Sequence, residues 1–142
     1  MPISYRVCPA ISVEEAIDLY KRSTLGERRP VDSPGIFSAM LRNANLIVVA
    51  TDGMRLVGIA RTLTDFEYVA YVADLAVDVA YQRRGIGTRL VRETRDRLGG
   101  DCTMVLIAAP NANDYYPKIG FEHAPRAWIL KRSHRLRERK VR

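Results

Sequence analysis

Two glycines and their neighbouring arginines form the part of the sequence best suited to binding chemistry. Gly85 and Gly87 stand in the stretch QRRGIG (residues 82–87), and Arg89 follows two residues later. A glycine turn that opens a helix leaves backbone N–H groups without partners inside the helix, and the missing side chains let a ligand approach. The arginines add positive charge, so a ligand with several phosphates fits better than a lone carboxylate. Spacing alone leaves an ordinary solvated turn as the alternative.

The elements on either side of this turn differ in their period. Leu75 and Val77 alternate with small or acidic residues, as in a strand, whereas the apolar positions from Leu90 to Leu98 recur at helical spacing. The sequence therefore predicts strand, glycine turn and helix. A dinucleotide-binding fingerprint would need a third glycine at position 90, and a P-loop would need Gly-Lys followed by Ser or Thr. The sequence has neither.

Length and composition predict a single globular domain. The chain has 142 residues, of which 47% are hydrophobic and 27% charged, so it can bury a substantial core. Neither an apolar run of membrane-spanning length nor a signal-peptide pattern is present, and a cytoplasmic location is expected. Cys8 and Cys102 are expected to be buried or partly buried thiols rather than a disulfide or a metal site. His123 and His134 lack metal-ligand spacing, so no metal is expected.

The basic charge is concentrated near the C-terminus. Five basic residues against one acidic residue give residues 133–142 a charge of +4, which leaves +3 of the total +7 for the rest of the chain. We therefore predict one domain over residues 1–132 and a basic tail over residues 133–142. We expect the tail to be solvated rather than to bind nucleic acid.

Local patterns predict the remaining elements. Ser12 and Glu15 form a capping box at the start of a first helix, and Ser33 with Pro34 begins a second. A loop is expected over 25–32 and a short helix that ends near Gly120. Strands are expected over 3–8, 46–50, 56–60, 68–79, 103–109 and 127–131, with a hairpin turn at Asp52-Gly53 and a continuous apolar run that makes 103–109 a buried strand. The order β-α-α-β-β-β-α-β-α-β predicts an α+β (mixed α/β) fold around a largely antiparallel sheet.

Two local patterns resemble motifs of the GNAT acetyltransferases. The pattern Gln/Arg-x-x-Gly-x-Gly/Ala is met by Gln82, Gly85 and Gly87, and residues 114–121 (DYYPKIGF) are similar to the closing motif aromatic-Tyr-x-Lys-x-Gly-Phe. The predicted element order is also that of this family, and the resemblance covers residues 3–131.

A closer resemblance is to the plant and cyanobacterial serotonin N-acetyltransferase branch. The residues that carry it are Arg28-Arg29-Pro30, residues 39–43 and 56–61, Asp65, Asp74 and Asp114-Tyr115-Tyr116.

The family resemblance implies acetyl-CoA as the cofactor, held where the strands over 74–79 and 103–109 splay apart. Main-chain groups of the first strand would pair with the pantetheine arm, and the glycine turn would hold the pyrophosphate. The residues assigned to the cofactor in this way are Leu75, Ala76, Val77, Gln82, Arg83, Arg84, Gly85, Ile86, Gly87, Thr88 and Asn113. For Asn113, capping of the last helix is the alternative.

The resemblance also suggests catalytic residues. Tyr116 occupies the position of the general acid, and a phenol can donate a proton to a thiolate of comparable basicity. Asp74 is the candidate general base, with Tyr71 and water as alternatives. Asp65, Glu67 and the loop with Arg28 and Arg29 are candidates for the acceptor pocket, or else solvated and salt-bridged residues.

These features imply an acetyl-CoA-dependent N-acetyltransferase that acts on a primary amine of a small molecule, with an arylalkylamine suggested by the branch. A protein lysine or N-terminal acetyltransferase is one alternative. A non-catalytic acyl-CoA sensor or nucleic-acid-binding module is another. No membrane partner is expected, and a homodimer is left open because many small relatives pair through sheet edges or the last strand.

Overall fold

The computed structural model describes residues 2–139, and its contacts divide the chain into two compact units, Met1–Ala109 and Pro110–Arg142. The first unit contains, in order, β1 (Ile3–Val7), α1 (Val13–Arg22), η1 (Thr24–Arg28), α2 (Pro34–Asn43), β2 (Leu46–Asp52), β3 (Arg55–Thr64), β4 (Val69–Val77), η2 (Val79–Tyr81), α3 (Ile86–Arg95) and β5 (Thr103–Leu106). The second contains η3 (Pro110–Ala112) and α4 (Tyr115–Lys118). The elements labelled η are short 3₁₀ helices.

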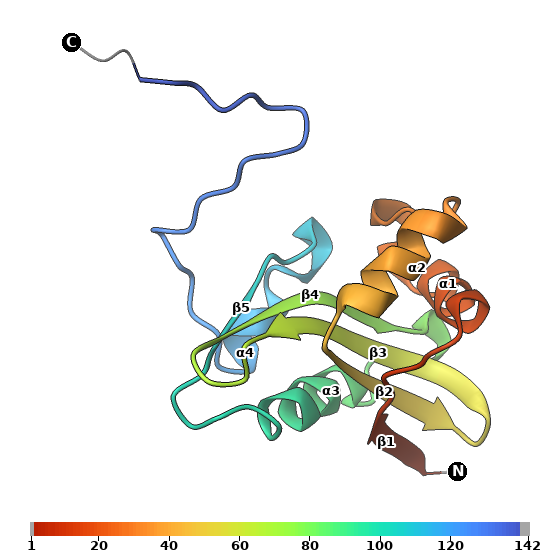
Figure 1. Cartoon of the computed structure of the whole chain (residues 1–142). Helices are drawn as coiled ribbons and strands as arrows, with labels where there is room; N and C mark the ends of the chain where they lie inside the picture. The colour runs from red at the N-terminus through yellow and green to blue at the C-terminus, as the bar shows by residue number, and fades with distance from the viewer. Residues whose placement is uncertain (1, 140–142) are drawn as a thin grey trace. The chain divides into compact units, whose positions relative to one another are not determined.

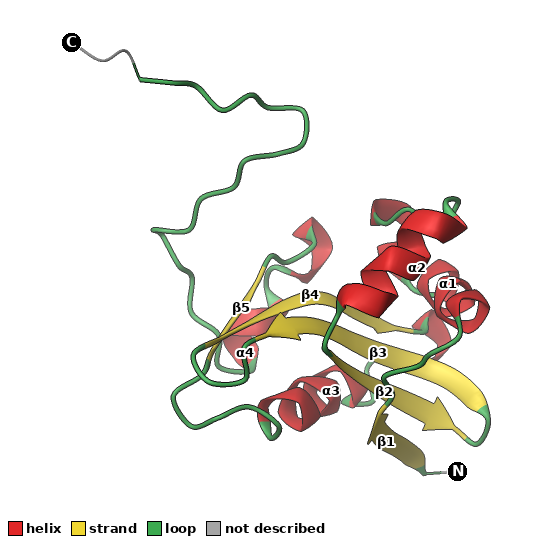
Figure 2. Ribbon diagram, in the orientation of Figure 1, coloured by secondary structure: helices red, strands yellow, loops and turns green. Residues whose placement is uncertain are grey.

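The first unit is built on one five-stranded sheet in the order β1-β2-β3-β4-β5. The first four strands pair antiparallel with their neighbours, and β5 pairs with β4 in parallel. Helices α1 and α2 cover one face of the sheet and α3 covers the other (Figures 1 and 2). The predicted α+β fold with a mostly antiparallel sheet is confirmed.

Each face of the sheet has its own apolar core. On the α1 and α2 face, Tyr20 and Phe37 pack edge to face with ring centroids 4.8 Å apart. On the opposite face, Ile86 and Leu90 of α3 pack against β2 and β3. A Cβ atom at Gly58 would lie 2.9 Å from Leu90 Cδ1, so this glycine lets α3 approach the sheet closely. The close packing fixes the helix that follows the glycine turn.

The predicted helix starts are confirmed at α1 and modified at α2. The Ser12 hydroxyl accepts a hydrogen bond from the Glu15 N–H at 3.3 Å, as in a capping box. Ser33 precedes α2 but makes no side-chain capping bond, while Pro34 occupies the first turn. The loop predicted over 25–32 instead contains η1, which begins where the Ser23 hydroxyl accepts from the Leu25 N–H.

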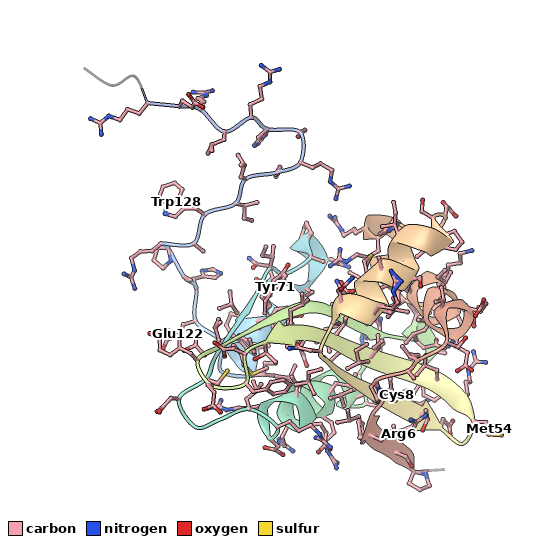
Figure 3. All side chains as sticks on the ribbon, viewed as in Figure 1. Arg6, Cys8, Met54, Tyr71, Glu122 and Trp128 are labelled. Atoms are coloured by element: carbon pink, nitrogen blue, oxygen red, sulfur yellow. The ribbon has the colours of Figure 1, made fainter. Side chains whose placement is uncertain are left out.

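Two strand predictions in the C-terminal third are wrong. The buried strand expected over 103–109 is β5, which ends at Leu106, and Val105 and Ile107 are exposed. The helices of the first unit pack mainly on β2, β3 and β4, so β5 at the edge of the sheet is covered less and its side chains stay exposed. Residues 127–131 form no strand and have no regular secondary structure. Trp128, which Figure 3 labels, is exposed.

Other sequence expectations concern the tail, membrane spans and cysteines. Residues 133–139 are exposed, and residues 140–142 of the predicted basic tail lie outside the described residues. None of the helices in the described part of the chain is both long and apolar enough to cross a bilayer. Cys8 and Cys102 are free thiols of intermediate exposure, as predicted.

Candidate active site

The C-terminal half of β4 has one edge that β5 does not pair. The parallel ladder between the two strands ends at Val72. Further along, the Asp78 N–H donates to the Val57 carbonyl of β3 at 2.9 Å. Because hydrogen bonds alternate along an antiparallel strand, the peptide groups of Leu75 and Val77 face away from β3. They therefore lie on the edge beyond the β4–β5 ladder, where an extended ligand can pair with them.

The glycine turn follows directly and opens α3. Gly85 is the residue before the helix and has φ +80°, a left-handed conformation that favours glycine. Arg83 also has a positive φ of 65°, which is uncommon for a non-glycine residue. Arg83 and Arg84 are exposed, and the Arg84 guanidinium lies 5.0 Å from the centre of the Tyr81 ring. The turn thus presents positive charge at the start of a ten-residue helix.

The side chains of Gln82 and Arg89, which flank the glycine turn, already make contacts within the protein. The Gln82 side-chain amide donates to the Val77 carbonyl at 3.1 Å, which links the turn to the β4 edge. Arg89 lies over the Tyr5 ring at 4.7 Å and pairs with Glu93 at 3.2 Å. Arg89 is still 49% exposed, so the exposed positive charge near the turn comes from Arg83, Arg84 and Arg89.

Asp78 anchors the chain between β4 and the turn. Its carboxylate is buried and forms ion pairs with Arg22 at the end of α1 and with Arg55 of β3. It also accepts from the Ala80 N–H at 2.9 Å, and Arg22 donates to the Leu56 carbonyl at 2.9 Å. These bonds hold the start of the turn against the sheet.

Asp74 of β4 lies in a buried cluster of charged and polar groups between the sheet and helices α1 and α2. Its side chain is 0% exposed. One carboxylate oxygen accepts from Arg29 Nε at 2.5 Å, and the other accepts from Arg61 Nε and from the Tyr20 hydroxyl, each at 2.6 Å. Arg61 also donates to the Met40 carbonyl of α2 at 3.2 Å. The cluster joins α1, α2, β3 and β4 at one point.

The surroundings of Asp74 determine its protonation. Burial disfavours the charged carboxylate, but the ion pair with Arg61, together with Tyr20 and Arg29, outweighs burial and lowers the pKa of Asp74. Burial and the adjacent carboxylate raise the pKa of Tyr20 well above its ordinary value. Asp74 is therefore an ionised carboxylate with three donors, and these contacts favour an anchoring role. Its role as general base stays a prediction.

Tyr71, the competing candidate base, lies on a partly exposed apolar row. Leu63 of β3, Tyr71 of β4 and Val105 of β5 are directly opposite one another in register. The three residues are 38%, 39% and 41% exposed, so the row is accessible to a ligand. Tyr71 is labelled in Figure 3. Such a row offers a flat apolar surface across three strands.

The second unit contains Tyr116 and Asn113. The Tyr116 ring packs edge to face against Tyr115 and Phe121, with centroids 5.2 Å and 5.5 Å away. Burial, with a smaller contribution from Tyr115, raises the pKa of Tyr116, so its phenol stays protonated near neutral pH. Asn113 is exposed, and α4 begins after Asp114, so Asn113 is not the residue that caps this helix.

The residues considered for the acceptor pocket have different surroundings. Asp65 accepts from the N–H groups of Glu67, Tyr68 and Val69, and these bonds lower its pKa. Asp65 therefore shapes the turn before β4. Arg28 is exposed, whereas the other arginine of its loop is bound to the Asp74 cluster. No group of three or more His, Cys, Asp or Glu residues within 2–139 could hold a metal ion.

Sequence comparison identifies a known domain. Residues 43–123 match the profile of the Acetyltransferase (GNAT) domain. The probable acetyltransferase TAP2 of Glycine max is 27% identical over 128 residues, which cover 77% of this chain and 50% of that protein. The chloroplastic GCN5-related N-acetyltransferase 2 of Arabidopsis thaliana is 36% identical over 73 residues, covering 50% and 28%. The chain thus spans half or less of the length of these relatives.

Solved structures share the fold. The GNAT family acetyltransferase SP0256 from Streptococcus pneumoniae TIGR4 has a TM-score of 0.73 and 24% identity, covering 92% of this chain and 99% of that one. The aminoglycoside N-acetyltransferase AAC(6')-Iy in complex with CoA has a TM-score of 0.71 and 16% identity, covering 93% and 95%. At these identities the likeness shows the fold alone. The domain match, which covers more than half of the sequence, shows that the chain belongs to the GNAT acetyltransferase family.

Proposed function

We propose that this chain is an acetyl-CoA-dependent N-acetyltransferase that acetylates the primary amine of a small molecule, with an arylalkylamine as the leading acceptor class. The observation that carries the proposal is the β4 edge at Leu75 and Val77, followed directly by the glycine turn at Gly85. An extended pantetheine arm needs the first feature and a pyrophosphate needs the second.

In this proposal the cofactor supplies an activated acetyl thioester, and the chain positions it and moves protons. The peptide groups of Leu75 and Val77 bind the pantetheine arm, and the turn over 82–88 binds the phosphates. The amine nitrogen forms a bond to the acetyl carbon while the carbon–sulfur bond breaks. Tyr116, whose raised pKa keeps it protonated, gives its proton to the departing thiolate.

The amine must lose a proton, and three acceptors for it are proposed. Asp74 is ionised, but its three hydrogen-bond donors reduce its basicity. Tyr71 is accessible on the apolar row, and water is the third candidate. An arylalkylamine is supported by the resemblance to the serotonin-acetylating branch and by the apolar row, on which an aromatic ring can pack. A homodimer and a cytoplasmic location remain proposals.

Release of free CoA thiol from acetyl-CoA tests this function. The acceptor panel contains tryptamine, serotonin, a polyamine and a lysine peptide, the last because a 35% identical relative from Glycine max is named histone acetyltransferase TAP1. We expect turnover on an arylalkylamine, with kcat at least about tenfold lower in Tyr116→Phe, since a general acid contributes that much or more. Tyr115→Phe, which alters the neighbouring phenol, is the matched control and should retain most activity.

Two results would contradict the proposal. Turnover on the lysine peptide alone would replace the small amine by a protein acceptor. No turnover on any amine, despite tight acetyl-CoA binding, would favour an acyl-CoA sensor.

A further inference from the structure

Strand β4 contains a bulge at the point where it leaves β5. In the ladder with β3, Asp74 lies opposite Arg61, but Val72 lies opposite Thr62, so Ala73 has no opposing residue. Val72 is also the last residue that β4 pairs with β5. A bulge leaves one residue unpaired and reorients the strand that follows.

The bulge determines which peptide groups face the unpaired edge. Peptide groups alternate between the two edges of a strand, so one extra residue reverses the alternation beyond it. With the bulge present, the groups of Leu75 and Val77 face away from β3. In a regular ladder that continued from Val72, the same groups would face β3. The proposed cofactor edge therefore depends on this one-residue insertion.

Arg29 contacts both residues of the bulge. Its Nη2 donates to the Ala73 carbonyl at 3.0 Å, and its Nε donates to Asp74 Oδ1 at 2.5 Å. The first bond satisfies a carbonyl in the part of the ladder that the bulge disrupts, and the second is charge-assisted. Arg29 follows η1, in the segment between α1 and α2. Its planar guanidinium can make both bonds at once, which a lysine ammonium at a single point cannot do equally well.

We propose that Arg29 is a positioning residue for acetyl transfer, which holds the β4 bulge and thereby directs the peptide groups of Leu75 and Val77 toward the pantetheine arm. This inference rests on the proposed function, because it takes that edge as the acetyl-CoA site. The hydrogen bonds of Arg29 go to Ala73, Asp74 and the Arg28 carbonyl, and none of them involves the proposed phosphate turn. Its effect should therefore appear in the binding of the pantetheine arm and not in the binding of the phosphates.

The other hydrogen bonds of Asp74 allow the effect of Arg29 on ligand binding to be measured in a variant that still folds. Without Arg29, the Asp74 carboxylate still has Arg61 and the Tyr20 hydroxyl as donors, and both are buried. The Arg29 side chain is itself 25% exposed, so its removal opens the cluster to water at one corner. We therefore expect Arg29→Ala to fold, with native circular dichroism and a cooperative unfolding transition.

Calorimetric binding of two ligands tests the proposal. Acetyl-CoA carries phosphates and the pantetheine arm, whereas adenosine 3′,5′-bisphosphate carries phosphates but no arm. In Arg29→Ala we expect Kd for acetyl-CoA to rise about tenfold or more, as for a lost charge-assisted hydrogen bond, with Kd for the bisphosphate nearly unchanged. Arg29→Lys, which keeps the positive charge but lacks the planar guanidinium, should give an intermediate Kd for acetyl-CoA. Arg6→Ala, which removes an exposed arginine from β1 at the opposite edge of the sheet from β5, is the matched control and should leave both values unchanged.

The outcomes separate this inference from the proposed function. If wild type binds acetyl-CoA and Arg29→Ala binds it equally well, or loses both ligands to the same degree, Arg29 is not a positioning residue. If wild type does not bind acetyl-CoA, the proposed function fails and the inference fails with it. If Arg29→Ala does not fold, Arg29→Lys provides the test. If Arg29→Lys binds both ligands with the Kd values of wild type, the proposal is overturned.

Discussion

Asp74→Asn should weaken the fold itself, because the carboxylate is the shared acceptor of three donors, of which Tyr20 and Arg61 are buried. The asparagine side chain has the same shape but only one acceptor oxygen, and its NH₂ group would face a guanidinium. Arg61, whose side chain is 10% exposed, or Arg29 would then lack its partner. Removing one member of a buried ion pair costs about 3–5 kcal/mol, because the remaining charge stays buried without compensation.

This loss is large relative to the stability of a domain. A total unfolding free energy of about 5–15 kcal/mol is typical, so the substitution would remove roughly a third to a half of a mid-range value. At about 2–4 °C per kcal/mol for a chain of this size, Tm should fall by roughly 6–20 °C. Urea unfolding followed by circular dichroism at neutral pH measures the change directly.

A matched control uses the same substitution at an exposed ion pair. Asp18 pairs with Arg22 at 3.0 Å in the i, i+4 arrangement, and its side chain is 67% exposed. Asp18→Asn should cost no more than about 0.5 kcal/mol. If Asp74→Asn unfolded at the wild-type urea concentration but had lost its turnover, the anchoring role would be refuted and the general-base role of Asp74 supported.

Two further predictions concern acid stability and the glycine turn. The folded-state pKa of Asp74 lies below the ordinary value of 3.8, so its stabilising contribution is complete above pH 3.8 and disappears as the pH falls through the folded-state pKa. Urea unfolding midpoints measured between about pH 5 and 2 should show this loss of stability in wild type and less of it in Asp74→Asn. Gly85→Ala should lower the free energy of unfolding by about 1–2 kcal/mol because of the positive φ at this position, although an added Cβ would meet no atom within 4 Å. Gly35→Ala in α2, where an added Cβ is equally free, should not destabilise the fold. Thermal melts of both variants check this. Equal Tm values for the two variants would contradict the assigned left-handed conformation.

The sequence predicts those parts of the fold that depend on near neighbours. The Ser12 cap of α1 is three residues from its partner, and the change of period at Gly85 marks the start of α3. The hairpin between β2 and β3 turns at Gly53-Met54, one residue beyond the predicted Asp52-Gly53, because Asp52 still pairs with Arg55. Each of these features is determined by backbone conformation and hydrogen bonding within one turn or loop. The local pattern is therefore sufficient to place them.

The charged cluster depends on contacts between distant parts of the chain. Asp74 is 13, 45 and 54 residues from Arg61, Arg29 and Tyr20, respectively. Periodicity shows only that an aspartate interrupts an apolar strand, and a functional carboxylate and an ion-paired one give the same pattern. The Asp78 cluster with Arg22 is unpredicted for the same reason, because its partners are 56 residues apart.

The strand errors have a related physical cause. An apolar run favours extended chain wherever it occurs, but only a partner strand converts extended chain into a sheet. Residues 103–109 find β4 as a partner for part of their length, and only Thr103–Leu106 becomes β5. Residues 127–131 are equally apolar yet form no ladder in the described structure. Composition determines the tendency to form a strand, and tertiary pairing decides whether the strand forms.

The two roles considered for Asp74 place opposite demands on its environment. A general base needs a free lone pair and a pKa near the working pH, which burial without donors would provide. An anchor needs its oxygens fully occupied, which lowers the pKa and holds the carboxylate ionised. The donors Arg29, Arg61 and Tyr20 meet the second demand. If Asp74 holds the bulge in this way, the proton of the amine must leave through water or Tyr71. Turnover of Tyr71→Phe, compared with wild type across the pH range, would distinguish these two routes.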